Sequence, residues 1–261
     1  MRSALLNIMV GAATKAGRSL TKDFNEVENL QVSIKGPADF VSNADRRAEE
    51  IVFTELQKAR PTYGFLGEEG TEVAGTDGQH RWIVDPLDGT TNYVHGFPAY
   101  CVSIALADGD DLLVAAIHDP LRDECFTARR GGGSRLNGTL FKTPAVTDPA
   151  EAVAAVSFPA HVGPDSPAIA DFIAVLTHVH SVRRTGSTAL NLAYLAAGRL
   201  HAFWVRRICC WDAAAGILIA REAGGVVGSF EGGPEVIPLD DPAFIAASTP
   251  ELLAALRIIL G

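Results

Sequence analysis

Two carboxylates spaced three residues apart dominate the stretch from Trp82 to Asn92, which reads WIVDPLDGTTN. The apolar run before Asp85 predicts a buried strand, and Pro86 predicts its end, because proline cannot donate a ladder hydrogen bond. Asp85 and Asp88 would then lie on a tight turn at the end of the strand. Mg²⁺ is commonly held in proteins by a few carboxylates together with substrate phosphate. An Asp-Gly turn without any ligand is the alternative interpretation of this stretch taken alone.

Further acids stand at the ends of other predicted elements. Glu68 follows the strand-like run 63–67, and Asp212 stands at the start of a long helical segment. Asp45 precedes a helix expected from about residue 46 to residue 60. Taken singly, Glu68 is typical of a solvated loop charge, while Asp45 and Asp212 are typical of helix caps.

Strand and loop ends that each present an acid can converge at one edge of layered sheets. A cluster of Glu68, Asp85, Asp88 and Asp212 would be strongly repulsive without a counter-charge. Divalent metal ions supply that charge, and two of them can clamp a phosphate during an in-line displacement. The predicted chemistry is therefore phosphate hydrolysis.

The turn after Asp88 would serve the same chemistry. Its Gly89 and Thr90 amides could hold phosphate oxygens, since consecutive amides of a turn form anion-binding concavities. The Thr90 hydroxyl and the Glu68 carboxylate could orient an attacking water.

Composition sets broad bounds on this hypothesis. The 261 residues suffice for one large domain or two small ones, and 48% hydrophobic with 20% charged residues is typical of a globular protein. A net charge of -9 argues against a nucleic-acid-coating protein, whose surface would be basic. It allows a small anionic substrate, because bound metal inverts the local charge. The four cysteines lack C-x-x-C spacing, which favours reduced thiols and a cytoplasmic location, and no apolar run is long enough to predict a membrane span.

Periodicity and turn residues predict the elements that must position the acids. Proline-rich residues 144–168 suggest a boundary near residue 145, which would divide the chain into halves 1–145 and 146–261. The second half alternates helix and strand, which favours α/β layering. The expected helices are 3–24, 46–60, 169–176, 188–198, 213–223 and 250–260. The expected strands are 63–67, 82–85, 99–108, 112–118, 124–128, 178–184, 200–205 and 226–229.

Three segments together resemble the signature motifs of the inositol monophosphatase family. They are GEEG at 67–70, the stretch at 82–92 and WDAAAGILIAREAGG at 211–225. The segments KGPADFVSNAD at 35–45 and RRTGSTALNLAYLAAGR at 183–199 extend the resemblance over nearly the whole chain. The resemblance implies a layered α+β or α/β fold, the five-layered αβαβα sandwich, in a homodimer. It also implies Mg²⁺-dependent, lithium-sensitive hydrolysis of a small phosphomonoester, foremost inositol 1-phosphate.

The resemblance also implies a role for each matching residue. Two to three Mg²⁺ ions would be bound, the third through water on Glu68. The first would be held by Glu68, Asp85 and the Leu87 carbonyl, and the second by Asp85, Asp88 and Asp212. Thr90, supported by Asp45, would activate the attacking water. The substrate side would comprise Asp88, the Gly89 and Thr90 amides, and the turn Gly186, Ser187 and Thr188.

One position departs from the family pattern. Members that bind inositol often carry a glutamate seven residues before the helix-starting aspartate, and that position is Val205 here. Valine cannot accept bonds from sugar hydroxyls, so a site built on polar pairing should lose preference for inositol. Neighbouring Arg206 could instead pair with an anionic group of the substrate, although a solvated surface charge is its simpler interpretation.

The departure leaves alternative functions open. Related substrates would be fructose 1,6-bisphosphate, histidinol phosphate or 3′-phosphoadenosine 5′-phosphate. A different class of function would be a regulatory member of the family that binds a protein partner.

Overall fold

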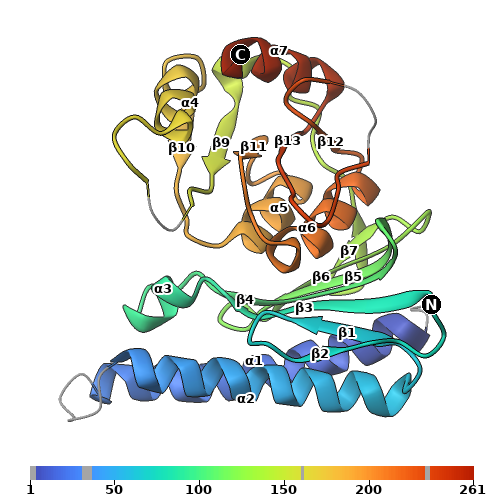
Figure 1. The fold of residues 1–261 in the computed structure, drawn as a ribbon. Coiled ribbons are helices and arrows are strands. Elements are labelled where there is room, and N and C mark those ends of the chain that lie inside the picture. The colour runs from blue at the N-terminus through green and yellow to red at the C-terminus, as the bar shows by residue number, and fades with distance from the viewer. Residues whose placement is uncertain (1–3, 31–36, 160–161, 233–235) are drawn as a thin grey trace.

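The chain folds into five layers that alternate between helices and sheets (Figure 1). The computed structural model describes residues 4–30, 37–159, 162–232 and 236–261. Helices α1 and α2 cover one face of an eight-stranded sheet, and helices α5 and α6 cover its other face. A five-stranded sheet follows, and α4 and α7 close the stack. The expected αβαβα sandwich is confirmed.

The two sheets use separate stretches of the chain. The eight-stranded sheet has the order β2-β1-β3-β4-β5-β6-β7-β8 and the five-stranded sheet the order β10-β9-β11-β13-β12. The helices are α1 Ala4–Leu30, α2 Pro37–Ala59, α3 Thr90–Val94, α4 Pro167–Leu176, α5 Thr188–Ala196, α6 Cys210–Glu222 and α7 Pro250–Leu260, with a short 3₁₀ turn at Pro149–Glu151. The strands of the first sheet are β1 Gly64–Gly67, β2 Glu72–Val73, β3 His80–Asp88, β4 Cys101–Asp108, β5 Asp111–Asp119, β6 Glu124–Arg129, β7 Ser134–Leu136 and β8 Thr139–Phe141. Those of the second are β9 Val153–Val156, β10 Ser181–Arg183, β11 Ala202–Val205, β12 Val226–Gly228 and β13 Phe244–Ala247. A division into two domains near residue 145 stays a prediction.

Strand pairing explains how the acids reach one edge of the sheet. β1 and β3 run parallel, with Gly67 opposite Val84. The residue that follows each of these two is therefore an acid, Glu68 on one strand and Asp85 on the other. Parallel neighbours end at the same edge, so the register alone brings the two carboxylates together.

Helix α6 brings the third acid from the middle layer. Its residues from Ala213 to Ala220 are all buried, because the helix is covered by the sheet on one side and by α5 on the other. Gly216 permits this close packing, since a Cβ there would lie 2.5 Å from the Leu192 side chain. The helix starts after β11, and its first turn carries Asp212.

Several elements differ from the sequence expectation. β3 continues through Pro86 to Asp88, and its pairing with β4 is irregular between Asp85 and Asp88. Proline is tolerated at such a bulge, because the bulged backbone donates no ladder bond there. Helix α2 begins at Pro37, so Asp45 lies inside the helix and the cap interpretation is wrong. Of the family-like segment 35–45, residues 35 and 36 lie outside the described part of the chain.

Strands β2, β7 and β8 and helix α3 were not expected either, and further differences lie in the second half. Strand β10 is only Ser181–Arg183, so the expected strand 178–184 is shorter at both ends. Strands β9 and β13 were not expected from the pattern, because their short apolar runs are buried on both faces. Within the described residues, no helix is long and apolar enough to cross a membrane.

Candidate functional site

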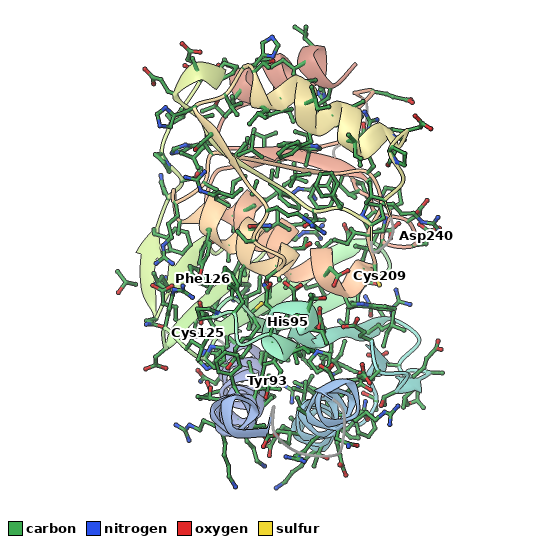
Figure 2. All side chains as sticks on the ribbon, turned by 90° about the vertical axis from the view of Figure 1, so that its left-hand side faces the viewer. Tyr93, His95, Cys125, Phe126, Cys209 and Asp240 are labelled. Atoms are coloured by element: carbon green, nitrogen blue, oxygen red, sulfur yellow. The ribbon has the colours of Figure 1, made fainter. Side chains whose placement is uncertain are left out.

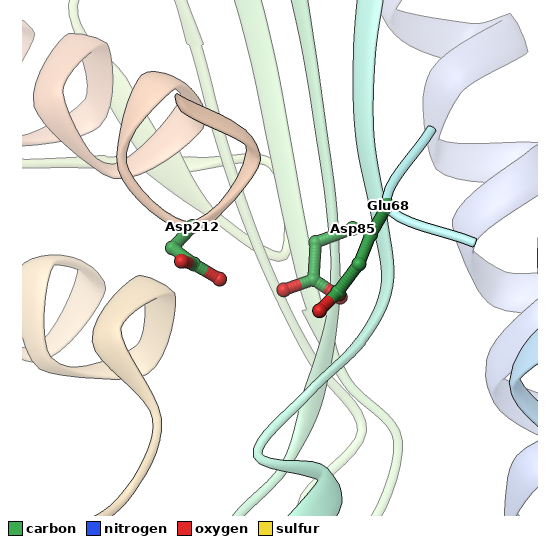
Figure 3. A group of neighbouring side chains, drawn as sticks. All are labelled: Glu68, Asp85 and Asp212. Atoms are coloured by element: carbon green, nitrogen blue, oxygen red, sulfur yellow. The ribbon is translucent and has the colours of Figure 1, made fainter. Parts of the chain in front are cut away.

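Three carboxylates from three elements meet at the edge of the eight-stranded sheet (Figure 3). One oxygen each of Glu68, Asp85 and Asp212 lies within 4.8 Å of the others. Glu68 is exposed, Asp85 is buried and Asp212 is half-buried, so the group is open to solvent on one side. The spacing allows one small cation to contact all three residues.

The electrostatics of this cluster favour a bound cation. Burial raises the pKa of Asp85 well above its ordinary value, and nearby Glu68 and Asp88 raise it further. Burial also raises the pKa of Asp212 to about 6 and, with the charge of Asp88, raises that of Glu68. The three acids therefore resist ionising together in the absence of positive charge. An all-oxygen donor set of this kind fits Mg²⁺.

Asp88 lies beside this cluster and faces the start of helix α5. Its carboxylate accepts hydrogen bonds from the Ser187 hydroxyl at 2.5 Å, the Ala189 amide at 2.7 Å and the Thr188 amide at 3.3 Å. Burial and the charge of Asp212 raise its pKa to about 7, against the lowering effect of these bonds. Asp88 is thus near Asp212 but not one of the three acids whose oxygens meet within 4.8 Å.

The turn after β3 has a backbone that only glycine adopts without strain. Gly89 has φ 100°, and a Cβ there would lie 2.7 Å from the Ala99 carbonyl oxygen. The Thr90 hydroxyl donates to the Leu87 carbonyl oxygen at 3.0 Å. That carbonyl, which the family resemblance assigns to a metal, keeps a second lone pair.

The expected support of Thr90 by Asp45 is not formed. Asp45 is buried in α2, and burial together with Glu69, Glu68 and Glu49 raises its pKa to about 8. Across the described residues no hydrogen bond joins it to Thr90, because the Thr90 hydroxyl is turned toward the Leu87 carbonyl.

The turn before α5 joins the two halves of the chain. Ser187 caps the helix by accepting a hydrogen bond from the Leu190 amide at 3.3 Å. Thr188 bonds to the Ser157 hydroxyl at 2.7 Å. Gly186 has φ 83°, and a Cβ there would lie 2.9 Å from the Asn92 side chain.

Asn92 is a site residue whose role was not predicted from the sequence. Its amide nitrogen donates to the Ala99 carbonyl at 2.7 Å and to the Thr185 carbonyl at 2.8 Å. It thereby ties the turn after β3 to the turn before α5. Its place as the last residue of the stretch 82–92 was the available signal.

A cleft of about 1230 Å³ opens between the two halves and includes Asp88 and Asp212 in its lining. Cys209 and Asp240, labelled in Figure 2, also line it. Its cationic side chains are Arg81, Arg184 and Arg207. Asp110, Asp240 and Asp241 line it as well, so substrate-sized space with charges of both signs adjoins the acidic cluster.

The structure places the two specificity candidates away from this cleft. Val205 is fully buried in the core and pairs with Phe244 of β13. Arg206 forms a two-pronged ion pair with Asp171 at 2.6 and 2.9 Å, and it also donates to the Leu260 carbonyl at 3.0 Å. Neither residue lines the cleft. Arg206 thus pairs with Asp171 in this structure, and its contact with a substrate anion stays a prediction.

The decisive comparison is with a family model. The model described as "Inositol monophosphatase family" matches residues 1–259. The chain belongs to the inositol monophosphatase family. The match includes every motif that carried the resemblance, and the acidic cluster lies within it.

Individual members of the family are similar over almost their full length. The chain is 49% identical over 261 residues to "Inositol-1-monophosphatase" of Rhizobium meliloti (strain 1021), covering 99% of this chain and 97% of that protein. It is 40% identical over 253 residues to "Nus factor SuhB" of Vibrio cholerae, covering 97% and 94%.

Solved structures of the family share the fold. Extragenic suppressor protein suhB from Bartonella henselae superimposes with a TM-score of 0.89 at 47% identity, covering 99% of this chain and 98% of that one. Inositol monophosphatase from Anabaena (Nostoc) sp. PCC 7120 gives 0.86 at 31% identity, covering 98% and 94%.

Proposed function

We propose that this member of the inositol monophosphatase family hydrolyses a small phosphomonoester with the help of Mg²⁺. The observation that carries the proposal is the convergence of Glu68, Asp85 and Asp212 beside a cleft of substrate size. A repulsive group of partly desolvated acids is costly to the fold, and a metal-dependent active site accounts for that cost. The names of the similar proteins support the same class of reaction.

The residues of the cluster would hold the metal ions. Glu68, Asp85 and the Leu87 carbonyl would bind the first, and Asp85, Asp212 and Asp88 the second. When bound, Mg²⁺ supplies positive charge to phosphoryl oxygens and lowers the pKa of an attacking water. Asp88 would have to share its carboxylate between this task and the amides of α5.

The turn residues would position the phosphate and the water. The left-handed backbone of Gly89 turns the chain so that the Gly89 and Thr90 amides can donate to phosphate oxygens. Because the Thr90 hydroxyl donates its hydrogen to the Leu87 carbonyl, its oxygen is left to accept a hydrogen bond from the attacking water and so to orient it. Glu68 would accept from the same water and help to ionise it.

For the substrate we propose inositol 1-phosphate first, because two proteins that are 49% and 48% identical to the chain bear the name inositol-1-monophosphatase. The apolar, buried Val205 argues for a weak preference, since it offers no acceptor for sugar hydroxyls. Fructose 1,6-bisphosphate, histidinol phosphate and 3′-phosphoadenosine 5′-phosphate are the alternatives. Among the residues that line the cleft, Arg81 and Arg184 could pair with a second anionic group of the substrate, whereas Arg207 already lies 3.7 Å from Asp241. A cytoplasmic homodimer that lithium inhibits is part of the same proposal.

The test is phosphate release from a panel of these four compounds, with and without Mg²⁺ and with added Li⁺. We expect Mg²⁺-dependent release that Li⁺ reduces. Release chiefly from inositol 1-phosphate would show that Val205 is tolerated. No release from any compound would contradict the proposal.

A regulatory role is the second candidate, because relatives about 40% identical are named Nus factors. Such a role would need the fold and a protein surface but not the acidic cluster. The variant Asp88→Asn separates the two, since a binding role should survive it and phosphate release should not. This chain keeps all four acids expected at the metal site, which favours the enzymatic function over a purely regulatory one. They are Glu68, Asp85, Asp88 and Asp212.

A further inference from the structure

Glu49 is a buried acid that contacts the loop carrying Glu68. It lies in α2 and is 2% exposed. Its carboxylate accepts hydrogen bonds from the Glu69 amide at 2.9 Å and from the Thr71 amide at 3.1 Å. One side chain thus holds two amides of the loop between β1 and β2, and one of those amides directly follows Glu68.

Gly67 makes room for this contact. A Cβ at Gly67 would lie 2.1 Å from Oε2 of Glu49, so the carboxylate rests directly against the backbone of the residue before Glu68. The loop is also closed by a backbone bond from the Gly67 amide to the Thr71 carbonyl at 2.9 Å.

The Glu68 backbone is fixed from its other side by the strand that carries Asp85. Its amide donates to the Val84 carbonyl oxygen at 3.2 Å. Glu68 therefore has β3 on one side and the Glu49-bound amide on the other. These contacts leave little freedom in the direction from which its carboxylate approaches Asp85.

We propose that Glu49 is a positioning residue that holds the Glu68 loop at the metal site. The inference rests on the proposed Mg²⁺-dependent function. No cation pairs with Glu49 among the described residues, so the two amides are its compensation for burial. A second carboxylate beside the site also adds negative potential that attracts cations, and the experiment must separate this effect from positioning.

Three variants of the full-length chain make that separation. Glu49→Gln keeps the size of the side chain but can accept from only one of the two amides at a time. Gly67→Ala keeps the charge of Glu49 but pushes its carboxylate off the loop. Glu50→Gln is the matched control, because Glu50 is the next residue of the same helix and is exposed.

The readouts are Mg²⁺ binding by titration calorimetry and the Mg²⁺ concentration that gives half-maximal phosphate release. Loss of a residue that orients a metal ligand typically costs roughly 10- to 100-fold in metal affinity. We expect losses in that range for Glu49→Gln and Gly67→Ala, with kcat at saturating Mg²⁺ changed less. The double variant should lose less affinity than the product of the two single losses, because both act on one contact. Glu50→Gln should bind as the original protein does.

The outcomes distinguish the failures. Unchanged Mg²⁺ affinity in a folded Glu49→Gln variant, with only its melting temperature lowered, would show a purely structural role and overturn the inference. If Glu49→Gln does not fold, unchanged affinity in Gly67→Ala would overturn it equally. Weakened affinity in Glu49→Gln but not in Gly67→Ala would assign the effect to charge and also overturn positioning. Failure of the original protein to release phosphate, with Mg²⁺ binding intact, would count against the proposed function alone.

Discussion

The cost of burying charge in the acidic cluster, together with repulsion inside it, predicts that removing one acid stabilises the metal-free protein. The perturbation is Asp212→Asn, which keeps the shape of the side chain and its acceptor oxygen but removes the charge. In the folded protein the pKa of Asp212 is raised from 3.8 to about 6, chiefly by burial. Ionising this residue therefore costs the fold about 3 kcal/mol once the pH is well above 6, because each pKa unit corresponds to about 1.4 kcal/mol.

The sign of the pH dependence follows from linkage. A carboxyl group with a raised folded-state pKa contributes stability that is present below its unfolded pKa and is lost as the pH rises through the folded one. For Asp212 the loss runs from about pH 4 to somewhat above pH 6. The Asp212→Asn variant has no such loss, so its stability gain over the original protein should grow between about pH 4 and pH 6 and be nearly complete above pH 6.

Urea unfolding in EDTA at pH 4 and pH 8 measures this difference. The gain in unfolding free energy for Asp212→Asn should be under about 1 kcal/mol at pH 4 and approach about 3 kcal/mol at pH 8. Coupling to Asp85 adds to this gain, since Asp85 ionises more easily once Asp212 is neutral. Saturating Mg²⁺ should reverse the order, because it stabilises the protein that binds it better. Equal stability of the two proteins at pH 8 without metal would refute the argument that burial and repulsion make the ionised Asp212 costly to the fold.

Three further variants test individual contacts of the site and its surroundings. Gly89→Ala should lower the unfolding free energy by roughly 1–3 kcal/mol and reduce phosphate release, because alanine is strained at φ 100° and its Cβ would meet the Ala99 carbonyl oxygen. A normal melting temperature of this variant would contradict the stated geometry. Arg206→Ala should lower the unfolding free energy by about 2–4 kcal/mol, because it leaves the buried Asp171 carboxylate unpaired, and it should leave KM unchanged. A raised KM at normal stability would instead place Arg206 in the substrate site. Asn92→Ala should lower kcat about tenfold in steady-state kinetics, because the turn before α5 loses its hydrogen bond to the turn after β3. An unaltered kcat would show that these hydrogen bonds do not position the site.

Much of the site follows from local rules that the sequence carries. Glu68 and Asp85 each follow an apolar run that ends at a breaker, and parallel pairing of those runs then places the acids together. Asp212 at a helix start follows from the change of period after residue 205. The cap at Ser187 follows from residue type and position. These features depend on neighbours within a few residues, which patterns describe well.

The missed features depend on partners distant in sequence. Nothing near Arg206 indicates Asp171, which lies 35 residues away on another helix. Nothing near Glu49 indicates the loop amides that it accepts from, about 20 residues further on. Pro86 would be expected to end the strand. Pairing with β4 nevertheless continues to Asp88, with an irregular register between Asp85 and Asp88. Local rules cannot foresee such compensation.

The central claim is that the acidic cluster works as a metal-dependent phosphatase site. The most direct test compares Mg²⁺-dependent phosphate release by the original protein and by Asp85→Ala, with circular dichroism to verify the fold. An oxygen of Asp85 lies within 4.8 Å of oxygens of both other acids, so its loss should lower the rate on the order of 10³-fold or more. Phosphate release by the original protein and its loss in a folded Asp85→Ala variant is the predicted result. A near-normal rate in that variant would contradict the account.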